Sequence, residues 1–306
     1  MLTNIFLGII LIKNIYYIMR CSMSKEAQQH HTHITSKHKW FNLNLKEVWK
    51  YRDLIILFTK RSFVLKYKQT VLGPAWLFLN PIMTSLIYTF VFGGIAGIET
   101  DGVPQILFYL GGNAVWTFFS TCITTNANAF VANSAVFGKV YFPRLTTPIS
   151  NVLSSVVQFG IQMILVLAFL IYYVVTGAVH PNWLACLAIP VVLLVLGIMG
   201  LGCGIIISSL TTKYRDLSIL IGFGVQLWMY ATPIVYPISQ IENELFKTVL
   251  LINPATAPIE LFRYALLGQG MISVSGLIYS SVFAAIVMVL GIMVFNKVEK
   301  TFMDTV

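Results

Sequence analysis

Long apolar segments separated by short polar ones dominate this chain. Six of them, each of about 20 residues or more, are long enough to cross a hydrocarbon core of roughly 30 Å as helices. They cover residues 72–98, 104–130, 148–176, 183–210, 217–236 and 272–296. A membrane β-barrel would show short alternating segments instead. The pattern therefore predicts an all-α membrane protein with six transmembrane helices over residues 72–296.

The segment at residues 43–71 differs because its charged and apolar residues separate at helical spacing. Such a helix lies in the membrane surface, although a helix packed on a protein partner fits too. We predict an amphipathic interface helix. Its apolar side holds Leu45, Val48, Trp49, Ile55, Ile56 and Phe63, and its charged side holds Lys46, Glu47, Lys50, Asp53 and Arg61.

The link between the fifth and sixth runs is predicted to contain two short helices. Its semi-apolar pieces, Ile238–Ile252 and Ala255–Leu267, are separated by Asn253 and Pro254. Each piece is too short to span. Re-entrant or surface helices fit best, with any exposed backbone shielded by protein or water.

Positive charge orients the spans, because Lys and Arg favour cytoplasmic loops. The rule places four segments in the cytoplasm, and all six runs then alternate sides. These segments are residues 43–68, 133–147, 211–216 and the tail 297–306. Within the second of them, Lys139 and Arg144 are the only charged residues between Asp101 and Lys213.

Composition supports a membrane protein and argues against a nucleic-acid binder. The chain is 57% hydrophobic and 10% charged, whereas soluble domains carry about 25% charged residues. Of 20 Lys and Arg, 12 fall within residues 1–68, where they suit an anionic inner leaflet. The cysteines lack CxxC spacing, and three of the four lie in apolar runs as packing residues.

The N-terminal extension, residues 1–42, allows several interpretations. Residues 1–20 are apolar but interrupted by Lys13, which leaves an extra span, an interfacial segment or an upstream translation artefact with Met23 as the start. Residues 24–40 are polar and favour a disordered tail over a metal site. Four histidines lie there: His30, His31, His33 and His38.

The six runs contain no Asp, Glu, Lys, Arg or His. Ion-coupled transporters usually carry such a group in the membrane, and intramembrane enzymes need acids, histidines or a nucleophile–base pair. No GxxxxGK[ST] nucleotide loop is present either. We therefore expect no catalytic residue, metal or cofactor in this chain, and active transport would need energy from a partner protein.

Aromatic and amide side chains in the runs suit a path for sugars, which present apolar faces and hydroxyls. Interfacial aromatic belts and interhelical amide hydrogen bonds would produce the same composition. The candidates for a channel lining are Trp76, Asn80, Trp116, Phe119, Gln226, Trp228 and Tyr230.

Seven motifs in order resemble a known family. They are WKYRDLIILFTKR, KYKQTVLGPAW with the following NP, WTFFS with NSAVFGKVYFPR, KYRD, QLWMYATPIVYP, LINPATAPIELFRYALLG and VFNKVEKTFMDTV. Over residues 43–306 the chain resembles the permease subunits of ABC-2 type polysaccharide exporters, which serve O-antigen, teichoic acid and capsule.

The resemblance implies a permease homodimer in the bacterial plasma (inner) membrane, with the mature N-terminus and C-terminus cytoplasmic. Two ABC ATPase subunits would bind beneath it and hold ATP and Mg. The cargo would be a glycan on polyprenyl pyrophosphate, threaded outward between the permeases.

The resemblance also implies roles for individual residues. A coupling segment that docks on the ATPase would comprise Ser134, Phe137, Lys139, Tyr141, Phe142, Pro143 and Arg144. Lipid head groups would meet Lys60, Arg61, Lys66, Lys68, Leu72 and Gly73. An outer gate would contain Pro237, Pro254, Glu260 and Arg263. The family more often has an Arg-Asp pair followed by Arg-Tyr-Lys where this chain reads TKRSFVLKYKQT.

Two other functions remain open from the residues. One is an ABC-2 permease for a drug or a simple lipid, against which the glycan-type motifs argue. The other is a membrane scaffold that transports nothing and needs no partner ATPase.

Overall fold

The computed structural model describes residues 45–68, 70–137, 142–212, 214 and 216–305. All of them belong to the larger of two compact units, Trp40–Val306. Every regular element within them is a helix, which confirms the all-α prediction. The expectations for residues 1–42, and those for Lys139 and Tyr141, fall outside the described residues.

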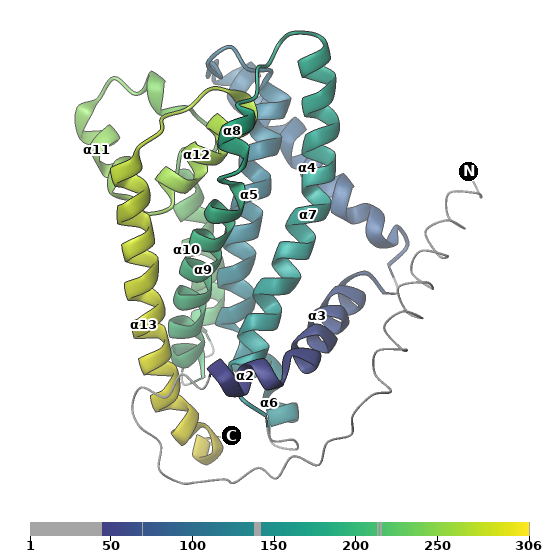
Figure 1. Ribbon diagram of the computed structural model, residues 1–306, viewed down its shortest axis with the longest axis vertical. Helices are drawn as coiled ribbons and strands as arrows, with labels where there is room; N and C mark the ends of the chain where they lie inside the picture. The colour runs from purple at the N-terminus through teal and green to yellow at the C-terminus, as the bar shows by residue number, and fades with distance from the viewer. Residues whose placement is uncertain (1–44, 69, 138–141, 213, 215, 306) are drawn as a thin grey trace. The chain divides into compact units, whose positions relative to one another are not determined.

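The helices follow one another with short connections (Figure 1). In chain order they are α2 (Leu45–Lys50), α3 (Arg52–Tyr67), the 3-10 turn η1 (Gly73–Ala75), α4 (Trp76–Tyr88), the π-helical η2 (Thr89–Ile95), α5 (Gln105–Ala127), α6 (Ala129–Phe137), α7 (Thr146–Val175), α8 (Trp183–Cys186), α9 (Ile189–Thr211), α10 (Leu217–Tyr230), the 3-10 turn η3 (Ile238–Gln240), α11 (Glu244–Ile252), α12 (Thr256–Leu267) and α13 (Val274–Thr305).

Five stretches of the described chain are long and apolar enough to cross a membrane. They are Gly73–Ile95, Gln105–Ala127, Thr146–Val175, Trp183–Thr211 and Val274–Lys297. Each coincides with a predicted run, so the multi-pass architecture is confirmed. The fifth run holds only the 14 residues of α10, a helix of about 21 Å at 1.5 Å per residue. A crossing there stays a prediction.

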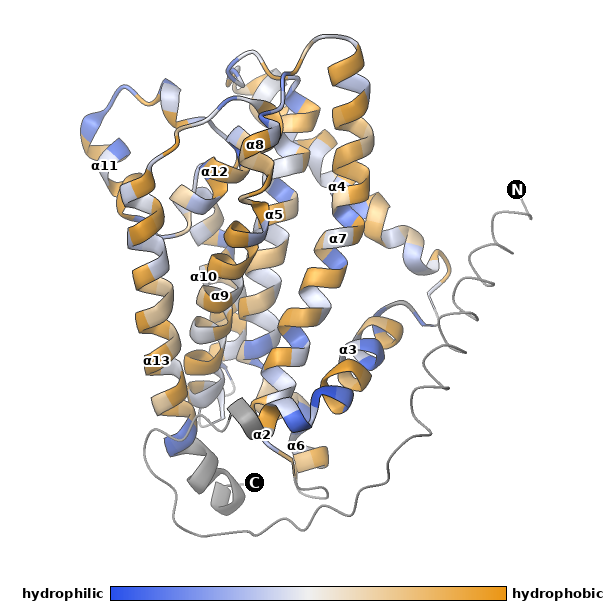
Figure 2. Ribbon diagram, viewed as in Figure 1, coloured by the Kyte–Doolittle hydropathy of each residue, from blue (hydrophilic) through white to orange (hydrophobic). Residues whose placement is uncertain are grey.

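Helix α5 is the centre of the bundle and contacts α4, α7, α9, α10 and α12. Within its apolar window 78% is buried, against 17% for Gly73–Ile95. Figure 2 shows hydrophobic residues over the long helices, while hydrophilic residues gather on α3 and around α11. The outer faces of α4, α7 and α13 are therefore suited to lipid or to another apolar partner.

Helices α9 and α13 pack most closely where two glycines face each other. A Cβ on Gly202 would lie 2.8 Å from the backbone nitrogen of Met288, and one on Gly291 would lie 2.9 Å from the carbonyl oxygen of Gly202. Small residues let helix backbones approach in membranes, where van der Waals contact drives association. This contact fixes the last span against the core.

The predicted interface helix is divided at Tyr51 into α2 and α3. Its buried side consists of Val48, Ile55 and Thr59, whose hydroxyl lies 3.3 Å from the carbonyl oxygen of Ser150 on α7. This stripe is narrow, because a single neighbouring helix covers few positions per turn. Trp49 and Ile56 of the predicted apolar side are exposed on the single chain, so their insertion into the membrane surface stays a prediction.

The two helices predicted between the fifth and sixth runs are present as α11 and α12, bent by 95° at the break between them. The Asn253 side chain fills the break. It accepts a hydrogen bond from Trp228 Nε1 at 3.0 Å and donates to the carbonyl oxygen of Ala231 at 2.9 Å. The bend is therefore tied to the end of α10.

Candidate functional site

An aromatic cluster surrounds the described part of the coupling segment. The ring of Phe142 lies 5.5 Å from Phe137 of α6 and 5.6 Å from Phe58 of α3. Phe137 in turn lies 6.1 Å from Phe130, which stacks on Phe295 of α13 at 4.8 Å. Aromatic pairs at these separations attract beyond simple burial. The cluster therefore connects α6 and the following loop with the interface helix and the last span.

Arg144 lies at the edge of this aromatic cluster. Its guanidinium carbon is 5.9 Å from the centre of the Phe137 ring, within the range of a cation–π interaction. The carbonyl oxygen of Pro143 accepts a hydrogen bond from Thr146 N at 2.9 Å. Ser134 lies on α6 and donates to Val131 O at 3.1 Å. The structure thus brings Phe137, Phe142 and Arg144 together at the start of α7.

The predicted head-group cations line the exposed side of α3 and its C-terminal end. Lys60, Arg61 and Lys68 are exposed. Lys66 is exposed as well, and it also reaches α7, where its Nζ donates to Gln158 Oε1 at 2.8 Å. Partial desolvation of its amine lowers the pKa of Lys66 below its ordinary value. One of the four lysine and arginine candidates therefore also fixes α3 on α7.

The turn between α3 and α4 depends on a glycine. Gly73 has φ +51°, a left-handed conformation that residues with a Cβ rarely adopt. Its backbone nitrogen donates to Thr70 O at 3.1 Å. Leu72, just before it, is half exposed, so this turn presents an apolar side chain beside the basic helix.

The channel-lining candidates separate into two groups. Trp116 and Phe119 are buried inside the bundle, with ring centres 6.4 and 5.2 Å from Trp228. These two belong to the protein core, not to a surface of the single chain. The other candidates reach the surface at least in part: Trp76, Asn80, Gln226, Trp228 and Tyr230. Composition could not separate the groups, because both contain aromatic residues at helical spacing.

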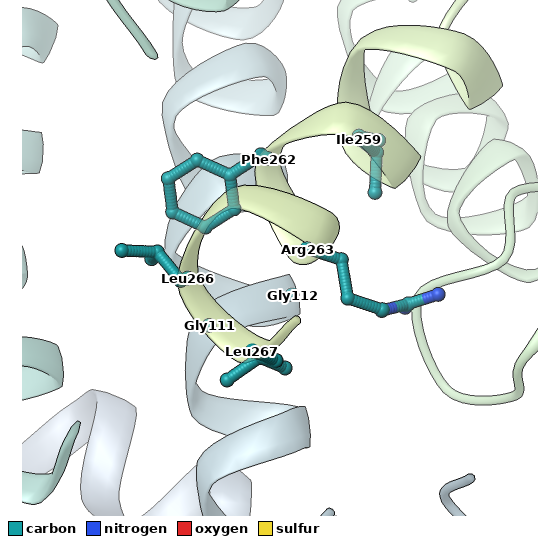
Figure 3. Close-up of a pocket in the computed structure, with 7 residues that line it drawn as sticks. All are labelled: Gly111, Gly112, Ile259, Phe262, Arg263, Leu266 and Leu267. Atoms are coloured by element: carbon teal, nitrogen blue, oxygen red, sulfur yellow. The ribbon is translucent and has the colours of Figure 1, made fainter. Parts of the chain in front are cut away.

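The outer-gate candidates include a buried ion pair. Arg263 Nη1 donates to Glu260 Oε1 within α12, and Arg263 Nη2 donates to the carbonyl oxygen of Pro233 at 2.5 Å. The other carboxylate oxygen of Glu260 accepts from Met271 N at 3.1 Å. Figure 3 shows Arg263 leaving α12 in a different direction from Phe262 and Leu266. The pair thus joins α12 to the segments on both sides of it.

The remaining gate candidates lie at helix boundaries. Pro237 precedes η3 as its N-cap residue, and Pro254 lies in the break between α11 and α12. The pocket between α12 and α5 shown in Figure 3 has a volume of only about 10 Å³, room for about one water molecule at most. Helix α12 therefore lies directly against α5.

Asp101 and Ser239 are functional candidates that the sequence analysis did not identify. Asp101 accepts hydrogen bonds from the Ser239 hydroxyl at 2.7 and 2.8 Å. They border a cavity of about 430 Å³ that Glu260 and Arg263 also line. The contact joins residues 138 positions apart, so no local pattern could have indicated it. Among the described residues no group of three or more His, Cys, Asp or Glu is arranged to hold a metal.

Comparison with known proteins places these features in a family context. The pattern of the family described as ABC-2 type transporter matches residues 53–267. The chain is 29% identical over 256 residues to an O-antigen export system permease protein of Klebsiella pneumoniae, covering 82% of this chain and 94% of that protein. It is also 29% identical over 211 residues to a protein of the same name from Myxococcus xanthus, covering 69% and 78%.

Proposed function

The chain belongs to the ABC-2 type transporter family, and on that premise we propose that it is the permease subunit of an O-antigen-like polysaccharide exporter. It would move a glycan linked to polyprenyl pyrophosphate from the cytoplasm across the inner membrane. The observation that carries this proposal is similarity to named O-antigen export permeases over nearly their whole length. As a transport subunit it has no catalytic role of its own.

Energy comes from two ABC ATPase subunits, which hold ATP and Mg. The surface for them is the coupling segment, from Ser134 to Arg144, including Lys139 and Tyr141. The aromatic cluster supports this role, because Phe142 contacts Phe58 of α3 while Phe130 stacks on Phe295 of α13. Close-packed rings transmit displacement with little loss. A push on α6 therefore shifts the interface helix and the last span together.

The basic side of α3 attracts the pyrophosphate of the cargo. Lys60, Arg61 and Lys68 are exposed there, and each basic residue near an anionic surface contributes about 1 kcal/mol of attraction. The Leu72–Gly73 turn lies next to them, at the start of the first span. The lipid thus meets cations first and apolar side chains next.

A second copy of the chain completes the path. The exposed faces of α4 and α10 carry Trp76, Asn80, Gln226 and Tyr230, and a homodimer encloses a channel between two such faces. With the positive-inside orientation, α11 and α12 form the outer gate and both mature termini are cytoplasmic.

A pull-down tests this function. The chain is expressed from Met1 and from Met23 with a C-terminal tag in its native host, purified in mild detergent, and assayed for ATP hydrolysis. We expect an ABC ATPase in stoichiometric amount, with turnover, and accumulation of lipid-linked glycan inside cells that lack the permease. A folded protein with no ATPase from either start would favour the scaffold instead. An ATPase without glycan accumulation would favour a drug or simple-lipid permease.

A further inference from the structure

A polar cleft of about 580 Å³ lies between α3 and the junction of α5, α6 and α7. Clefts of roughly 300–1,000 Å³ are typical of small-ligand sites. Its walls come from four elements that are distant in the sequence. The polar residues that matter most here are Arg61, Thr124, Thr125, Asn128, Thr147 and Asn151.

The α5 wall of the cleft offers hydrogen-bond acceptors. The hydroxyls of Thr124 and Thr125 donate to the backbone carbonyls of Ser120 and Thr121 at 2.9 and 2.6 Å. Asn128 Nδ2 donates to Thr124 O at 3.2 Å. A hydroxyl that donates its proton keeps lone pairs that accept from a ligand. The wall is therefore suited to a partner with several O–H groups.

Thr147 adds an unsatisfied group at the start of α7. It lines the cleft and is 3% exposed, and among the described residues its hydroxyl has no hydrogen-bond partner. A buried hydroxyl without a partner costs about 1–3 kcal/mol. Threonine adopts two χ1 rotamers in helices, so this hydroxyl can turn to a ligand without giving up a protein hydrogen bond.

The charge of the cleft is positive. Among the described residues of its lining Arg61 alone is charged, and it lies at the α3 side. A guanidinium binds phosphate oxygens through paired N–H groups, and the lining residues that the structure describes include no carboxylate that would repel them. Hydroxyls, amides and one arginine together match a sugar that carries a phosphate.

The polar wall also continues along α5 beyond the cleft. Ser120, Thr121, Thr124, Thr125 and Asn128 recur at spacings of three and four residues, which places them on one face of the helix. A sugar bound in the cleft thus has the further hydroxyls of Ser120 and Thr121 next to it, along the half of α5 that lies nearest the cleft.

We propose that this cleft binds the sugar unit next to the pyrophosphate of the lipid-linked cargo. Thr125, Asn128 and Thr147 hydrogen-bond its hydroxyls, while Arg61 binds the phosphate. This inference rests on the proposed function and goes further, because it assigns sugar recognition to α5 and α7 on the interface-helix side. It makes the sugar, and not the lipid alone, part of what the permease recognises before translocation.

The test uses the purified permease–ATPase complex in lipid nanodiscs and two probes, polyprenyl pyrophosphate and the same lipid bearing one sugar. Wild-type protein is expected to bind the sugar-bearing probe more tightly. Thr147→Val and the double variant Thr125→Val/Asn128→Leu should lower the affinity for the sugar-bearing probe about three- to tenfold. Their affinity for the sugar-free probe should not change. Arg61→Gln should lower the affinity for both probes.

Two control variants keep the outcomes distinct. Thr147→Ser keeps the hydroxyl and should bind like wild type, and Thr176→Val changes an exposed threonine outside the cleft. Unchanged sugar-dependent binding in both cleft variants would overturn the inference while leaving the exporter function intact. Wild-type protein that binds neither probe and copurifies with no ATPase would overturn both.

Discussion

Arg263 and Glu260 form an ion pair one turn apart in α12, and each side chain is 4% exposed. The arginine also lies over the ring of Phe108 on α5, with its guanidinium carbon 4.1 Å from the ring centre. Two charges buried this deeply are stable only when each satisfies the other. The ion pair therefore helps to hold α12 on the bundle.

Removing one member of the Arg263–Glu260 ion pair should destabilise the protein strongly. Arg263→Met leaves Glu260 buried without its partner, which costs about 3–5 kcal/mol in comparable sites. Thermal unfolding of the purified protein in detergent measures the loss. The double variant Glu260→Leu/Arg263→Met is the control and should lose less than the single variant. Equal losses in all variants would show that the two charges do not depend on each other.

Phe142 should be needed for coupling more than for insertion. Phe142→Ala removes a ring that contacts both Phe137 and Phe58, and truncation of a buried phenylalanine costs about 3–5 kcal/mol. We expect the protein to remain in the membrane while export falls. Phe142→Leu keeps most of the volume and should retain more export. Wild-type export in the alanine variant would contradict transmission through the aromatic cluster.

Reversing the charge at Arg144 should uncouple export without affecting membrane insertion. The glutamate in Arg144→Glu loses the cation–π contact with Phe137 and repels any acidic surface of the ATPase. Export of glycan and ATP hydrolysis are measured in parallel, with Arg144→Lys as the charge-preserving control. The coupling assignment is wrong if export continues at the normal rate.

Gly73 should tolerate only residues that adopt left-handed backbone. A Cβ there meets no atom within 4 Å, so any loss reflects the φ of +51° and not a steric clash. The conformation costs about 1–2 kcal/mol for most L-residues, whereas asparagine adopts it more readily. Gly73→Val should therefore lower export and Gly73→Asn should largely keep it. Equal export in the two variants would exclude a backbone requirement at this turn.

The charge on Lys66 should make ligand binding sensitive to alkaline pH. Partial desolvation lowers the pKa of Lys66, so its positive charge is present below that lowered pKa and disappears at a lower pH than for a fully solvated lysine. Affinity for polyprenyl pyrophosphate should fall over this window as pH rises. Lys66→Arg keeps its charge throughout and should remove this part of the fall. An identical pH profile in the variant would exclude Lys66 from the head-group site.

The contribution of Lys66 to folding stability should change with pH in the opposite direction to its contribution to ligand binding. Between the lowered pKa and the ordinary value, the unfolded chain binds more protons at Lys66 than the folded chain does, so this residue's contribution to stability rises with pH across that window. Thermal unfolding against pH, compared between wild type and Lys66→Arg, separates this effect from the loss of ligand binding.

Most of the secondary structure was predictable from local pattern. Five of the six apolar runs coincide with helices long enough to span, because continuous apolar sequence leaves the backbone no other way to satisfy its hydrogen bonds in lipid. The break at Asn253 and Pro254 was also predictable, since proline has no backbone N–H to donate within a helix. The break at Tyr51, between α2 and α3, had no comparable signal.

The site was predictable only in part. Phe137, Phe142 and Arg144 lie close together as their proximity in the sequence suggested. Trp116 and Phe119 were placed on a channel wall by composition, whereas the packing of α5 against the residues around Trp228 buries them. An aromatic residue at helical spacing looks the same in a core as on a channel wall, so the neighbouring helices decide.

The sequence by itself determined that this protein is helical, crosses a membrane several times and has no nucleotide loop of its own, because hydrophobic length and motif chemistry are local properties. Only the tertiary structure decided which groups meet. Asp101 reaches Ser239 across 138 positions, and Arg61 shares a cleft with Thr147 from a separate helix. Such contacts depend on the packing of several helices at once, which no local pattern specifies.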